Sequence, residues 1–522
     1  MAAVRFVNPR VFYSVTSSHT ILLSHIAWYR GSQPLFRRTF ASGSSPEDFK
    51  EKRITHDEAE LESQKAASKA STASSSSSAS IQSSTSFKSS ESFNQSLPSG
   101  WEDDPDWSIT KFTQLPHKEF GYNQHMKINE EFKESLRQML WQFRAPIRYA
   151  FAYGSGVFSQ SGSSGPTPSS LTPHPHAPEA ITKWQTGGGK VIDFIFGVSH
   201  TQHWHSLNIQ QYPEHYSFLR HMGSGVVSRV QDNWGAGVYF NPYITINGTM
   251  IKYGVVNLDT LRRDLSTWDT LYLAGRLHKP VKILRDDPTV RLANQLNLIS
   301  ALRTALLMLG PRFTELELYT KIASISYMGD PRMEFRGEDP NKIRNIVTNQ
   351  LPNFRQLYSP LVGELPNVEY KDVRCKSRDW LHDPRCDCGM EQDMDPIKRG
   401  NMVRRLPAAF RAKLYMEYRK KWQIPGADFA RMMEESRDED EKGFKKREGG
   451  DFDRRIAGEE EGVKDAVISS IQHTVKWPSW SQSIKGFATA GWSRGWKYVG
   501  EKRKKGKAIA QEKAKQAKGK KN

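Results

Sequence analysis

The sequence predicts an α/β fold with a mixed sheet, followed by a mostly helical region and a C-terminal amphipathic segment. Several short apolar runs have the length of core strands, and two strand-like stretches meet at Asn247-Gly248, a favoured hairpin turn. Leucines then recur at helical spacing between residues 292 and 309. The strand-like ranges are 147–153, 190–198, 238–240, 243–246, 250–256 and 280–284.

Helices are predicted before, between and after these strands. Pro146 follows the helix predicted at 129–143, and Gly310-Pro311 ends the helix predicted from the leucines at 292–309. Thr314 and Glu317 have the spacing of a capping box, which begins a further helix. With this helix, the predicted helical ranges are 129–143, 258–268, 292–309 and 341–351.

Charge and hydropathy narrow the class of partner. The chain has 522 residues and a net charge of +18, which favours anionic partners such as nucleotides, nucleic acid or an acidic lipid surface. Much of the excess lies in a lysine-rich tail at 501–522. Mean hydropathy is −0.66, and no run approaches the roughly 20 apolar residues of a spanning helix. A soluble or peripheral protein is therefore expected.

The N-terminus has the composition of a mitochondrial presequence. Residues 1–46 contain no Asp or Glu, and arginines are interspersed with Ser, Thr and apolar residues. Arg37-Arg38 precedes a plausible processing region. The stretch 44–97 is dominated by serine and cannot bury enough apolar surface to fold alone, so it is interpreted as a linker.

Three cysteines argue against a disulfide-stapled secreted protein. Cys375, Cys386 and Cys388 could form a zinc site with His382, but their spacing matches no common zinc pattern. Free thiols are the expectation.

Two neighbouring segments carry the chemistry. The apolar run ending at Tyr153 is followed by Gly154-Ser155-Gly156, a turn whose backbone N–H groups can hold phosphate. The next apolar run contains Asp193, a carboxylate that is costly to bury unless it binds something. A phosphate-holding turn beside a metal-holding aspartate is typical of nucleotidyltransferases. The alternatives are that the glycine turn binds no ligand and that Asp193 only forms hydrogen bonds inside the protein.

The C-terminal segment combines aromatic and basic residues. One helical face carries apolar residues from Val463 to Val475, and tryptophans interleaved with lysines and arginines follow. Such a segment suits a membrane interface, and docking of an ordinary helix on its own domain is the alternative. The aromatic and basic positions are Trp477, Trp480, Phe487, Trp492, Trp496, Tyr498, Lys476, Lys485, Arg494 and Lys497.

Several motifs taken in order resemble the family of mitochondrial translocator assembly and maintenance proteins, which are phosphatidate cytidylyltransferases. The similarity covers about 120–351 and, weakly, the aromatic C-terminal segment. The motifs are Tyr153-Gly154-Ser155-Gly156-Val157-Phe158, Asp193-Phe194-Ile195-Phe196-Gly197-Val198, His203-Trp204-His205-Ser206-Leu207-Asn208, Gly237-Val238-Tyr239-Phe240-Asn241-Pro242, Ile251-Lys252-Tyr253-Gly254-Val255-Val256 and Tyr272-Leu273-Ala274-Gly275-Arg276-Leu277-His278-Lys279-Pro280.

The resemblance implies a reaction and a place. CTP and phosphatidic acid would give CDP-diacylglycerol and pyrophosphate with Mg²⁺, toward cardiolipin, on the matrix side of the inner membrane among anionic lipids. No nucleic-acid partner is expected. The implied organisation is a presequence at 1–43, a linker at 44–97, a nucleotidyltransferase domain at 98–288 with an insertion at 159–189, a helical, winged-helix-like domain at 289–365, a variable charged insertion at 366–462 and a membrane-association segment at 463–522.

Site roles follow from the resemblance together with the chemistry of the residues. Asp193 would hold Mg²⁺ and act with Lys252 in catalysis, and the nucleotide would lie against the Tyr153 to Gly156 stretch. Lys252 lies on an apolar strand, where a buried ammonium needs an anion. The residues expected at the substrate phosphate are Arg276, Lys279, His205 and Asn208.

Some assignments stay open. Ile195 and Lys252 occupy positions where many nucleotidyltransferases have acids, so Asp232 or Asp259 could supply a further ligand. His203 and His205, on an expected loop, could ligate metal or be structural. The rival functions are an RNA-directed nucleotidyltransferase and a non-catalytic factor that maintains the inner-membrane translocase.

Overall fold

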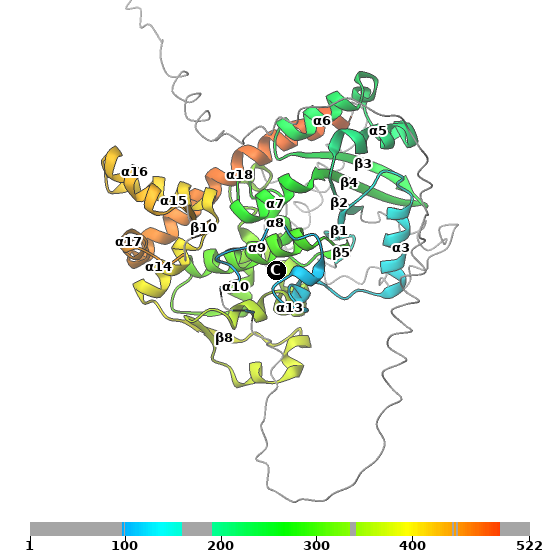
Figure 1. The fold of residues 1–522 in the computed structure, drawn as a ribbon. Helices are drawn as coiled ribbons and strands as arrows, with labels where there is room; N and C mark the ends of the chain where they lie inside the picture. The colour runs from blue at the N-terminus through cyan, green and yellow to red at the C-terminus, as the bar shows by residue number, and fades with distance from the viewer. Residues whose placement is uncertain are drawn as a thin grey trace, which may run out of the picture. The chain divides into compact units, whose positions relative to one another are not determined.

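A computed structural model describes most of the chain after Ser96 (Figure 1). The predicted presequence, the insertion 159–189, the lysine-rich tail and the last aromatic residues from Trp492 onward lie outside the described residues, as does the linker except Leu97. The described residues are 97–98, 100–158, 191–334, 341–440, 443–444 and 447–490.

A five-stranded mixed sheet forms the first part of the described chain. Its order is β3-β4-β2-β1-β5, with β2 and β4 parallel and the other neighbours antiparallel. The strands are β1 (Tyr149–Tyr153), β2 (Ile192–Val198), β3 (Val238–Ile246), β4 (Thr249–Asn257) and β5 (Lys282–Arg285). The prediction of a mixed α/β sheet is confirmed.

Strand β3 corrects one detail of the prediction. The two strand-like stretches on either side of Pro242 form a single strand with a bulge between Asn241 and Ile244. Pro242 has no N–H to donate to a ladder, which explains why the pairing is interrupted there. The predicted hairpin at Asn247-Gly248 is present, and both residues have the positive φ of such a turn, 48° and 72°.

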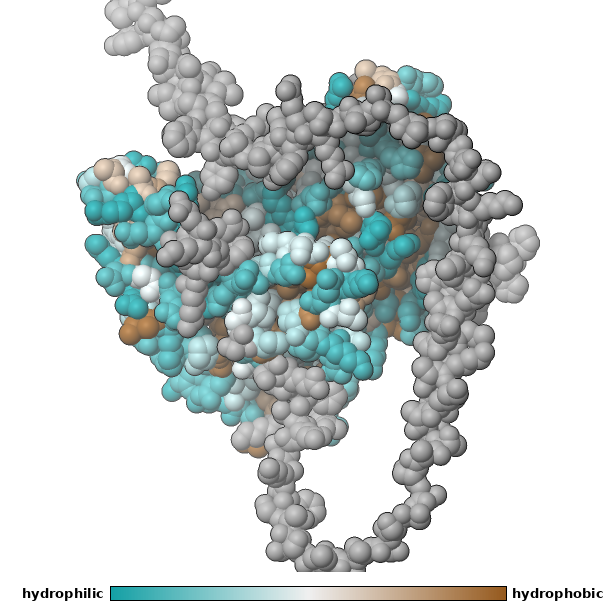
Figure 2. All heavy atoms as spheres, in the orientation of Figure 1, coloured by the Kyte–Doolittle hydropathy of each residue, from teal (hydrophilic) through white to brown (hydrophobic). Residues whose placement is uncertain are grey.

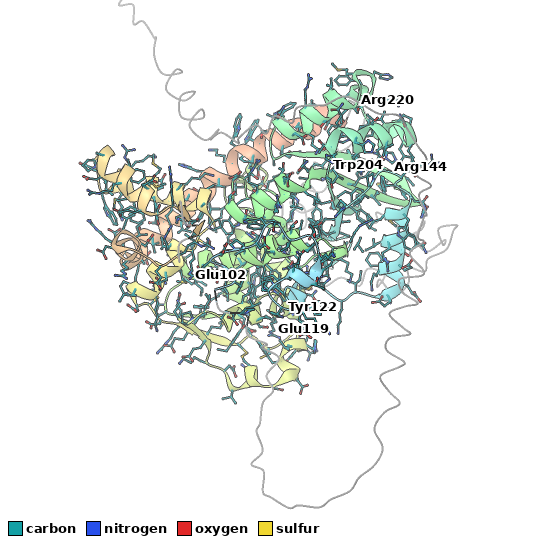
Figure 3. All side chains as sticks on the ribbon, viewed as in Figure 1. Glu102, Glu119, Tyr122, Arg144, Trp204 and Arg220 are labelled. Carbon is teal, nitrogen blue, oxygen red and sulfur yellow. A yellow bond between two sulfur atoms is a disulfide. The ribbon has the colours of Figure 1, made fainter. Side chains whose placement is uncertain are left out.

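Helices pack on both sides of this sheet. Trp204 on α5 contacts Phe196 and Tyr253 of the sheet, and it is labelled in Figure 3. The leucine stripe lies in α9, which is buried on almost all sides rather than on one face. Arg303 of α9 is buried and pairs with Glu102 at 2.6 Å. The helices are α3 (Glu130–Trp141), α5 (Thr201–Gln211), α6 (Ser224–Asn233), α7 (Leu258–Thr267), α8 (Ala274–Leu277) and α9 (Pro288–Leu307).

A helical region with a small sheet follows α9. The predicted capping box is present, because Thr314 N–H donates to Glu317 Oε2 at 2.9 Å and Glu317 N–H donates to Thr314 Oγ1 at 3.3 Å. The sheet has the order β6-β8-β7, and two of its strands come from the predicted charged insertion. The elements are β6 (Arg312–Thr314), α10 (Glu315–Ser324), α12 (Lys342–Asn349), α13 (Leu351–Val362), β7 (Val368–Tyr370) and β8 (Gly389–Gln392).

Helices of the predicted charged insertion at 366–462 bury some of their side chains. Phe429, Ile456 and Ala457 are buried, and the Tyr415 hydroxyl donates to the carboxylate of Asp453. Charged residues outnumber apolar ones in this segment, but the apolar residues lie on the helix faces that pack against the protein. The helices here are α14 (Pro396–Arg404), α15 (Ala408–Lys421), α16 (Gly426–Glu435) and α17 (Asp451–Gly458).

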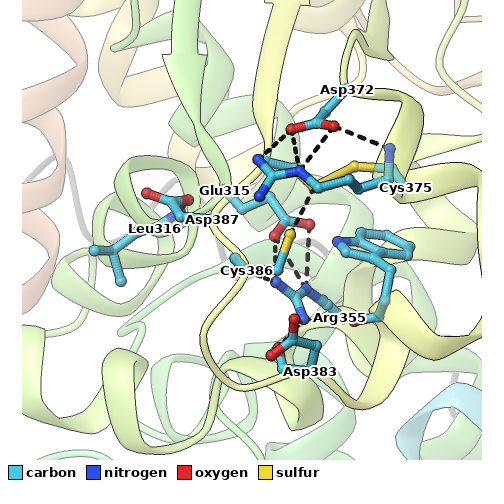
Figure 4. The surroundings of a disulfide bond; sticks show 11 residues. Glu315, Leu316, Arg355, Asp372, Cys375, Asp383, Cys386 and Asp387 are labelled. Carbon is cyan, nitrogen blue, oxygen red and sulfur yellow. Dashed lines mark hydrogen bonds and ion pairs between the residues drawn. A yellow bond between two sulfur atoms is a disulfide. The ribbon is translucent and has the colours of Figure 1, made fainter.

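The cysteines also differ from expectation. Cys375 and Cys388 form a disulfide, and Cys386 is a buried free thiol beside it (Figure 4). All three lie between β7 and β8, and Cys375 and Cys388 are 13 positions apart in the chain.

The last described helix, α18 (Glu460–Ala490), runs from α17 past α15 to the edge strand β3 (Figure 1). Val463, Val467, Ile471 and Val475 are buried, so the predicted apolar face docks on the protein itself. Among the described helices, none is long and apolar enough to cross a bilayer. The described surface seen in Figure 2 is mostly hydrophilic.

Candidate functional site

A cavity of about 270 Å³ opens between the five-stranded sheet and the helical region. The Gly154-Ser155 turn, Asp193 and Lys252 lie on its sheet side. The structure therefore brings together the two segments that sequence analysis singled out, although residues 159–190 separate them in the chain.

Three side chains form a row across the sheet. Tyr153 on β1 is the register partner of Asp193 on β2, and Asp193 is the register partner of Lys252 on β4. Register partners on adjacent strands point to the same face, so the three side chains share one surface. Lys252 Nζ lies 3.6 Å from Asp193 Oδ1 and 4.5 Å from the centre of the Phe240 ring.

The turn after β1 approaches this row closely. Gly154 has φ +83°, a left-handed conformation that costs other residues energy, and its carbonyl accepts from the N–H groups of Val157 and Phe158 at 3.1 and 3.0 Å. A Cβ on Gly154 would lie 3.3 Å from Asp193 Oδ2, and one on Gly156 would lie 2.8 Å from the carbonyl oxygen of Val191. Glycine at both positions therefore lets the turn lie against β2.

Arg276 reaches the row from α8. Its guanidinium donates to the Tyr153 hydroxyl at 3.3 Å and lies 4.0 Å from the ring centre of Tyr272. Loss of hydration raises the pKa of Tyr153, so this hydroxyl stays protonated and can accept from Arg276 while donating elsewhere. A cation is thus fixed at the Tyr153 end of the row.

Lys279 lies at the helical side of the cavity. Its ammonium donates to the Ser326 hydroxyl at 2.9 Å and lies 5.1 Å from the Tyr327 ring centre. The Lys342 ammonium lies 5.4 Å from the same ring. Loss of hydration, followed by repulsion from Arg276 and Lys342, lowers the pKa of Lys279 to about 7. An anion placed among these cations would relieve their repulsion.

The loop before α8 is held by one carboxylate. Asp264 is 4% exposed and accepts from the backbone N–H groups of Thr270, Leu271, Leu273 and Ala274 at 2.9–3.1 Å. This arrangement positions Tyr272 and the start of α8.

His278 anchors the segment between Arg276 and Lys279. Its Nε2 is 2.8 Å from Asn297 Oδ1 on α9, and its carbonyl accepts from the Tyr358 hydroxyl at 2.8 Å. Burial lowers the pKa of His278 to about 3, so the ring stays neutral.

His205 and Asn208 do not reach the cavity, which corrects their expected place at the substrate phosphate. They lie on α5, a helix where a loop was expected, and both are fully buried. His205 contacts Tyr216 at 2.9 Å, and Asn208 donates to Tyr216 and Tyr253 at 2.9 and 3.0 Å. Burial lowers the pKa of His205 to about 4. A buried polar network needs such partners without any ligand.

The alternative metal ligands also lie elsewhere. His203 is exposed, Asp232 accepts from Thr201 at 2.7 Å, and Asp259 pairs with Arg262 at 2.7 Å. None of the three lines the cavity. Among the residues that border it, Asp193 and Asp330 are the carboxylates.

Sequence reasoning missed the second wall of the cavity. Ser326, Tyr327, Asp330 and Lys342 come from the helical region, and α18 adds Val475 and Ser479. No local motif marks these positions, because they reach the site only through packing of distant segments. Lys342, at the start of α12, is the cation that no pattern indicated.

Comparisons with known proteins show the family of this chain. The sequence profile of the family described as "Phosphatidate cytidylyltransferase, mitochondrial" matches residues 136–505. Proteins of that name are similar to this chain: 43% identical over 248 residues in Schizosaccharomyces pombe, 43% over 259 in Saccharomyces cerevisiae and 40% over 249 in Homo sapiens.

The three alignments cover 48%, 49% and 47% of this chain. They span 58%, 62% and 50% of the relatives' own lengths, so each leaves over a third of the relative unmatched. The profile, in contrast, extends over more than half of this chain and includes the sheet, the cavity and α18. The chain therefore belongs to the mitochondrial phosphatidate cytidylyltransferase family.

Proposed function

We propose that this protein transfers the cytidylyl group of CTP to phosphatidic acid, giving CDP-diacylglycerol and pyrophosphate, an early step toward cardiolipin. The observation that carries the proposal is the position of Asp193 beside the Gly154 turn in a cavity that also holds Arg276 and Lys279. The reaction joins two phosphate-bearing substrates, and this cavity offers one carboxylate and several cations. The names of the relatives supply the chemical identity of the substrates.

The sheet side of the cavity would bind CTP. Backbone N–H groups of the Gly154-Ser155-Gly156 turn and the Ser155 hydroxyl are suited to the triphosphate, and Tyr153 borders the same space. Because the turn lies against Asp193, a triphosphate bound to the turn would lie next to the Asp193 carboxylate. Holding the triphosphate in line for attack at its α-phosphorus is the main task of such a site.

Asp193 fits a Mg²⁺ ligand. Its side chain is 29% exposed, faces the turn and has room on the Oδ2 side, where glycine replaces any Cβ. Mg²⁺ in nucleotide sites binds one or two carboxylates together with substrate phosphates. When bound, Mg²⁺ neutralises phosphate charge. Asp330 is the other carboxylate of the cavity and is the candidate for a second ligand.

The helical side would bind the phosphate of phosphatidic acid. Lys279 and Lys342 flank Tyr327 there, and Arg276 is near enough to Lys279 to repel its charge. This arrangement would place the attacking phosphate opposite the triphosphate. Lys252 would hold Asp193 in position and stabilise charge that develops during transfer.

We further propose a peripheral location on the matrix side of the mitochondrial inner membrane. Trp477, Trp480 and Ile484 of α18 are 74%, 45% and 45% exposed, although the apolar face of the helix from Val463 to Val475 is buried. Exposed aromatic residues next to the basic Lys476 suit an anionic lipid surface. Lys485 is excluded from this role, because it is buried and donates to the carbonyls of Gln231 and Trp234.

The helical region would be winged-helix-like. Three helices, α10, α12 and α13, lie next to a three-stranded antiparallel sheet formed by β6, β8 and β7. In this reading the region is a scaffold that brings Tyr327 and Lys342 to the cavity.

Pyrophosphate release by the purified full-length chain tests the function. We expect release with CTP, Mg²⁺ and vesicles that contain phosphatidic acid, and none when phosphatidylcholine alone forms the vesicles. Asp193→Ala should abolish release. Asp259→Ala is the matched control, because that carboxylate is exposed and lies outside the cavity.

The same assay separates the rival functions. Incorporation of nucleotide into RNA, without dependence on phosphatidic acid, would replace the proposal by an RNA-directed nucleotidyltransferase. Absence of release with any nucleotide, from folded chain that binds the vesicles, would leave a non-catalytic role in translocase maintenance.

A further inference from the structure

A cluster of sulfur and carboxylate ligands lies in the helical region, outside the cavity. We propose that the reduced protein binds a thiophilic divalent metal ion, with zinc as the fitting ion, through Cys375, Cys386, Cys388 and Glu315. The site is separate from the proposed magnesium ligand Asp193, and its occupancy does not depend on the proposed reaction.

Three of the four ligand atoms lie close together, and the fourth lies beside one of them (Figure 4). One carboxylate oxygen of Glu315 and the sulfurs of Cys375 and Cys388 all lie within 4.8 Å of one another. Cys386 Sγ lies 3.6 Å from Cys388 Sγ. Zinc–sulfur bonds of about 2.3 Å at a tetrahedral angle separate two sulfurs by about 3.8 Å, close to that spacing.

A buried arginine organises the surroundings of these ligands. Arg355 is fully buried, and its guanidinium donates to Glu315 Oε2 from Nη2 at 2.8 Å and from Nε at 3.0 Å. The same guanidinium donates to the carbonyls of Trp380, at 2.6 Å, and Cys386. It therefore fixes the carboxylate and the loop that carries the thiols, as outer partners commonly do for metal ligands. Its positive charge also offsets part of the negative charge of three thiolates and a carboxylate.

The backbone completes the arrangement. The Glu315 N–H donates to the Cys388 carbonyl at 3.0 Å, which joins the start of α10 to the strand β8. Ligands from the loop and from α10 would therefore be crosslinked by one ion. Since Ser326 and Tyr327 follow the end of α10, the ion would also support the helical wall of the cavity.

The disulfide defines the redox condition. A dithiol reductant would transfer two electrons and two protons to the Cys375–Cys388 bond, giving two thiols and an oxidised dithiol. Binding of the ion would then release the protons of the three thiols, because the thiolate is the ligand. The oxidised chain lacks two of the four ligands and should not hold the ion.

His382 is not part of this site, although it is the other metal-binding residue type nearby in the sequence. It is exposed, whereas Glu315, Cys386 and Cys388 are buried. His382→Gln therefore serves as the matched control.

The test is metal analysis of the full-length protein, purified with a phosphine reductant and dialysed against zinc-free buffer. We expect about one zinc per chain, as in closed structural sites. Cobalt substitution should give the charge-transfer and intense d–d absorption of tetrahedral thiolate coordination. Cys375→Ser and Cys386→Ser should each weaken zinc binding at least about tenfold, and His382→Gln should leave it unchanged.

Three outcomes would overturn the proposal. They are a folded, reduced chain with three titratable thiols and no bound zinc, zinc that remains after oxidation to the disulfide, and zinc lost with His382→Gln. Circular dichroism of each variant shows whether it is folded, and protection of the wild-type thiols from alkylation by added zinc gives a readout that needs no variant.

Discussion

The carboxylate of Asp193 and the ammonium of Lys252 lie 3.6 Å apart on neighbouring parallel strands, each side chain 29% exposed. At this exposure an ion pair contributes little to the free energy of unfolding, at most about 1 kcal/mol. Its value is geometric: the register of β2 and β4 fixes both groups at the cavity. Lys252 thus acts on the orientation of Asp193 and on the phosphates nearby.

Lys252→Met should separate catalysis from stability. We expect turnover to fall on the order of 100-fold, because a preorganised charge at the reacting phosphates is lost. The free energy of unfolding should change by less than about 1 kcal/mol. Pyrophosphate release and denaturant unfolding measure the two effects. Lys252→Arg keeps the charge and should recover part of the activity, whereas normal turnover in Lys252→Met would remove Lys252 from the mechanism.

Gly154→Ala tests the turn. The left-handed φ of +83° should cost about 1–2 kcal/mol, and the new methyl group would press toward Asp193 Oδ2 at 3.3 Å. We expect lower stability together with a higher KM for CTP. Gly310→Ala is the control, since a Cβ there meets no atom within 4 Å. If Gly154→Ala keeps the wild-type KM, the phosphates do not lie against this turn.

The lowered pKa of Lys279 predicts how the free energy of unfolding depends on pH. Its pKa is lowered from 10.5 to about 7 in the folded protein, chiefly by loss of hydration. Between these two values the unfolded chain holds a proton that the folded chain has released, so stability rises with pH across this range. Lys279→Met should flatten the rise seen by denaturant unfolding at several pH values. An equally steep rise in the variant would assign it to other groups.

Local patterns in the sequence predicted the sheet side of the site. The Gly154 turn, the strand that carries Asp193 and the Asn247-Gly248 hairpin each depend on residues that are neighbours in the chain. Such features need no knowledge of tertiary packing. Their contact with one another, in contrast, follows from a strand order that the sequence does not state.

The helical side could not be predicted in this way. Lys342 and Tyr327 reach the cavity through packing of α10 and α12, and no spacing rule links them to Asp193. His205 is the opposite case. Its place in a recognisable motif favours a role at the substrate phosphate, but in the structure it belongs to a buried hydrogen-bond network. Composition does not distinguish these two uses.

Asp264→Asn should destabilise the loop that presents Tyr272 and leads to Arg276. Both carboxylate oxygens accept from backbone N–H groups, and an amide nitrogen would face two of those donors. We expect a loss of about 2–3 kcal/mol in the free energy of unfolding, with reduced turnover. Asp269→Asn, a partly exposed carboxylate on the same loop, should cost less than about 1 kcal/mol. Equal effects of the two variants would contradict the special role of Asp264.

Trp477 and Trp480 should contribute to lipid binding without contributing to stability. Both are exposed on α18, whose opposite face is held by Val467 and Ile471. Burial of a large apolar side chain is favourable by about 1.5–3 kcal/mol, so Trp477→Ser should weaken binding to anionic vesicles by about tenfold or more. Trp141→Ser is the control, because that residue is 65% exposed on α3.

Vesicle co-sedimentation at several salt concentrations measures this effect. Binding should weaken as salt rises, since Lys476 and other cations act through screened charge. The doubly substituted chain, with Trp477→Ser and Trp480→Ser, should keep its unfolding midpoint and its activity on phosphatidic acid dispersed in detergent. If it also keeps wild-type affinity for vesicles while Trp141→Ser loses it, the membrane-facing surface lies on α3 and not on α18.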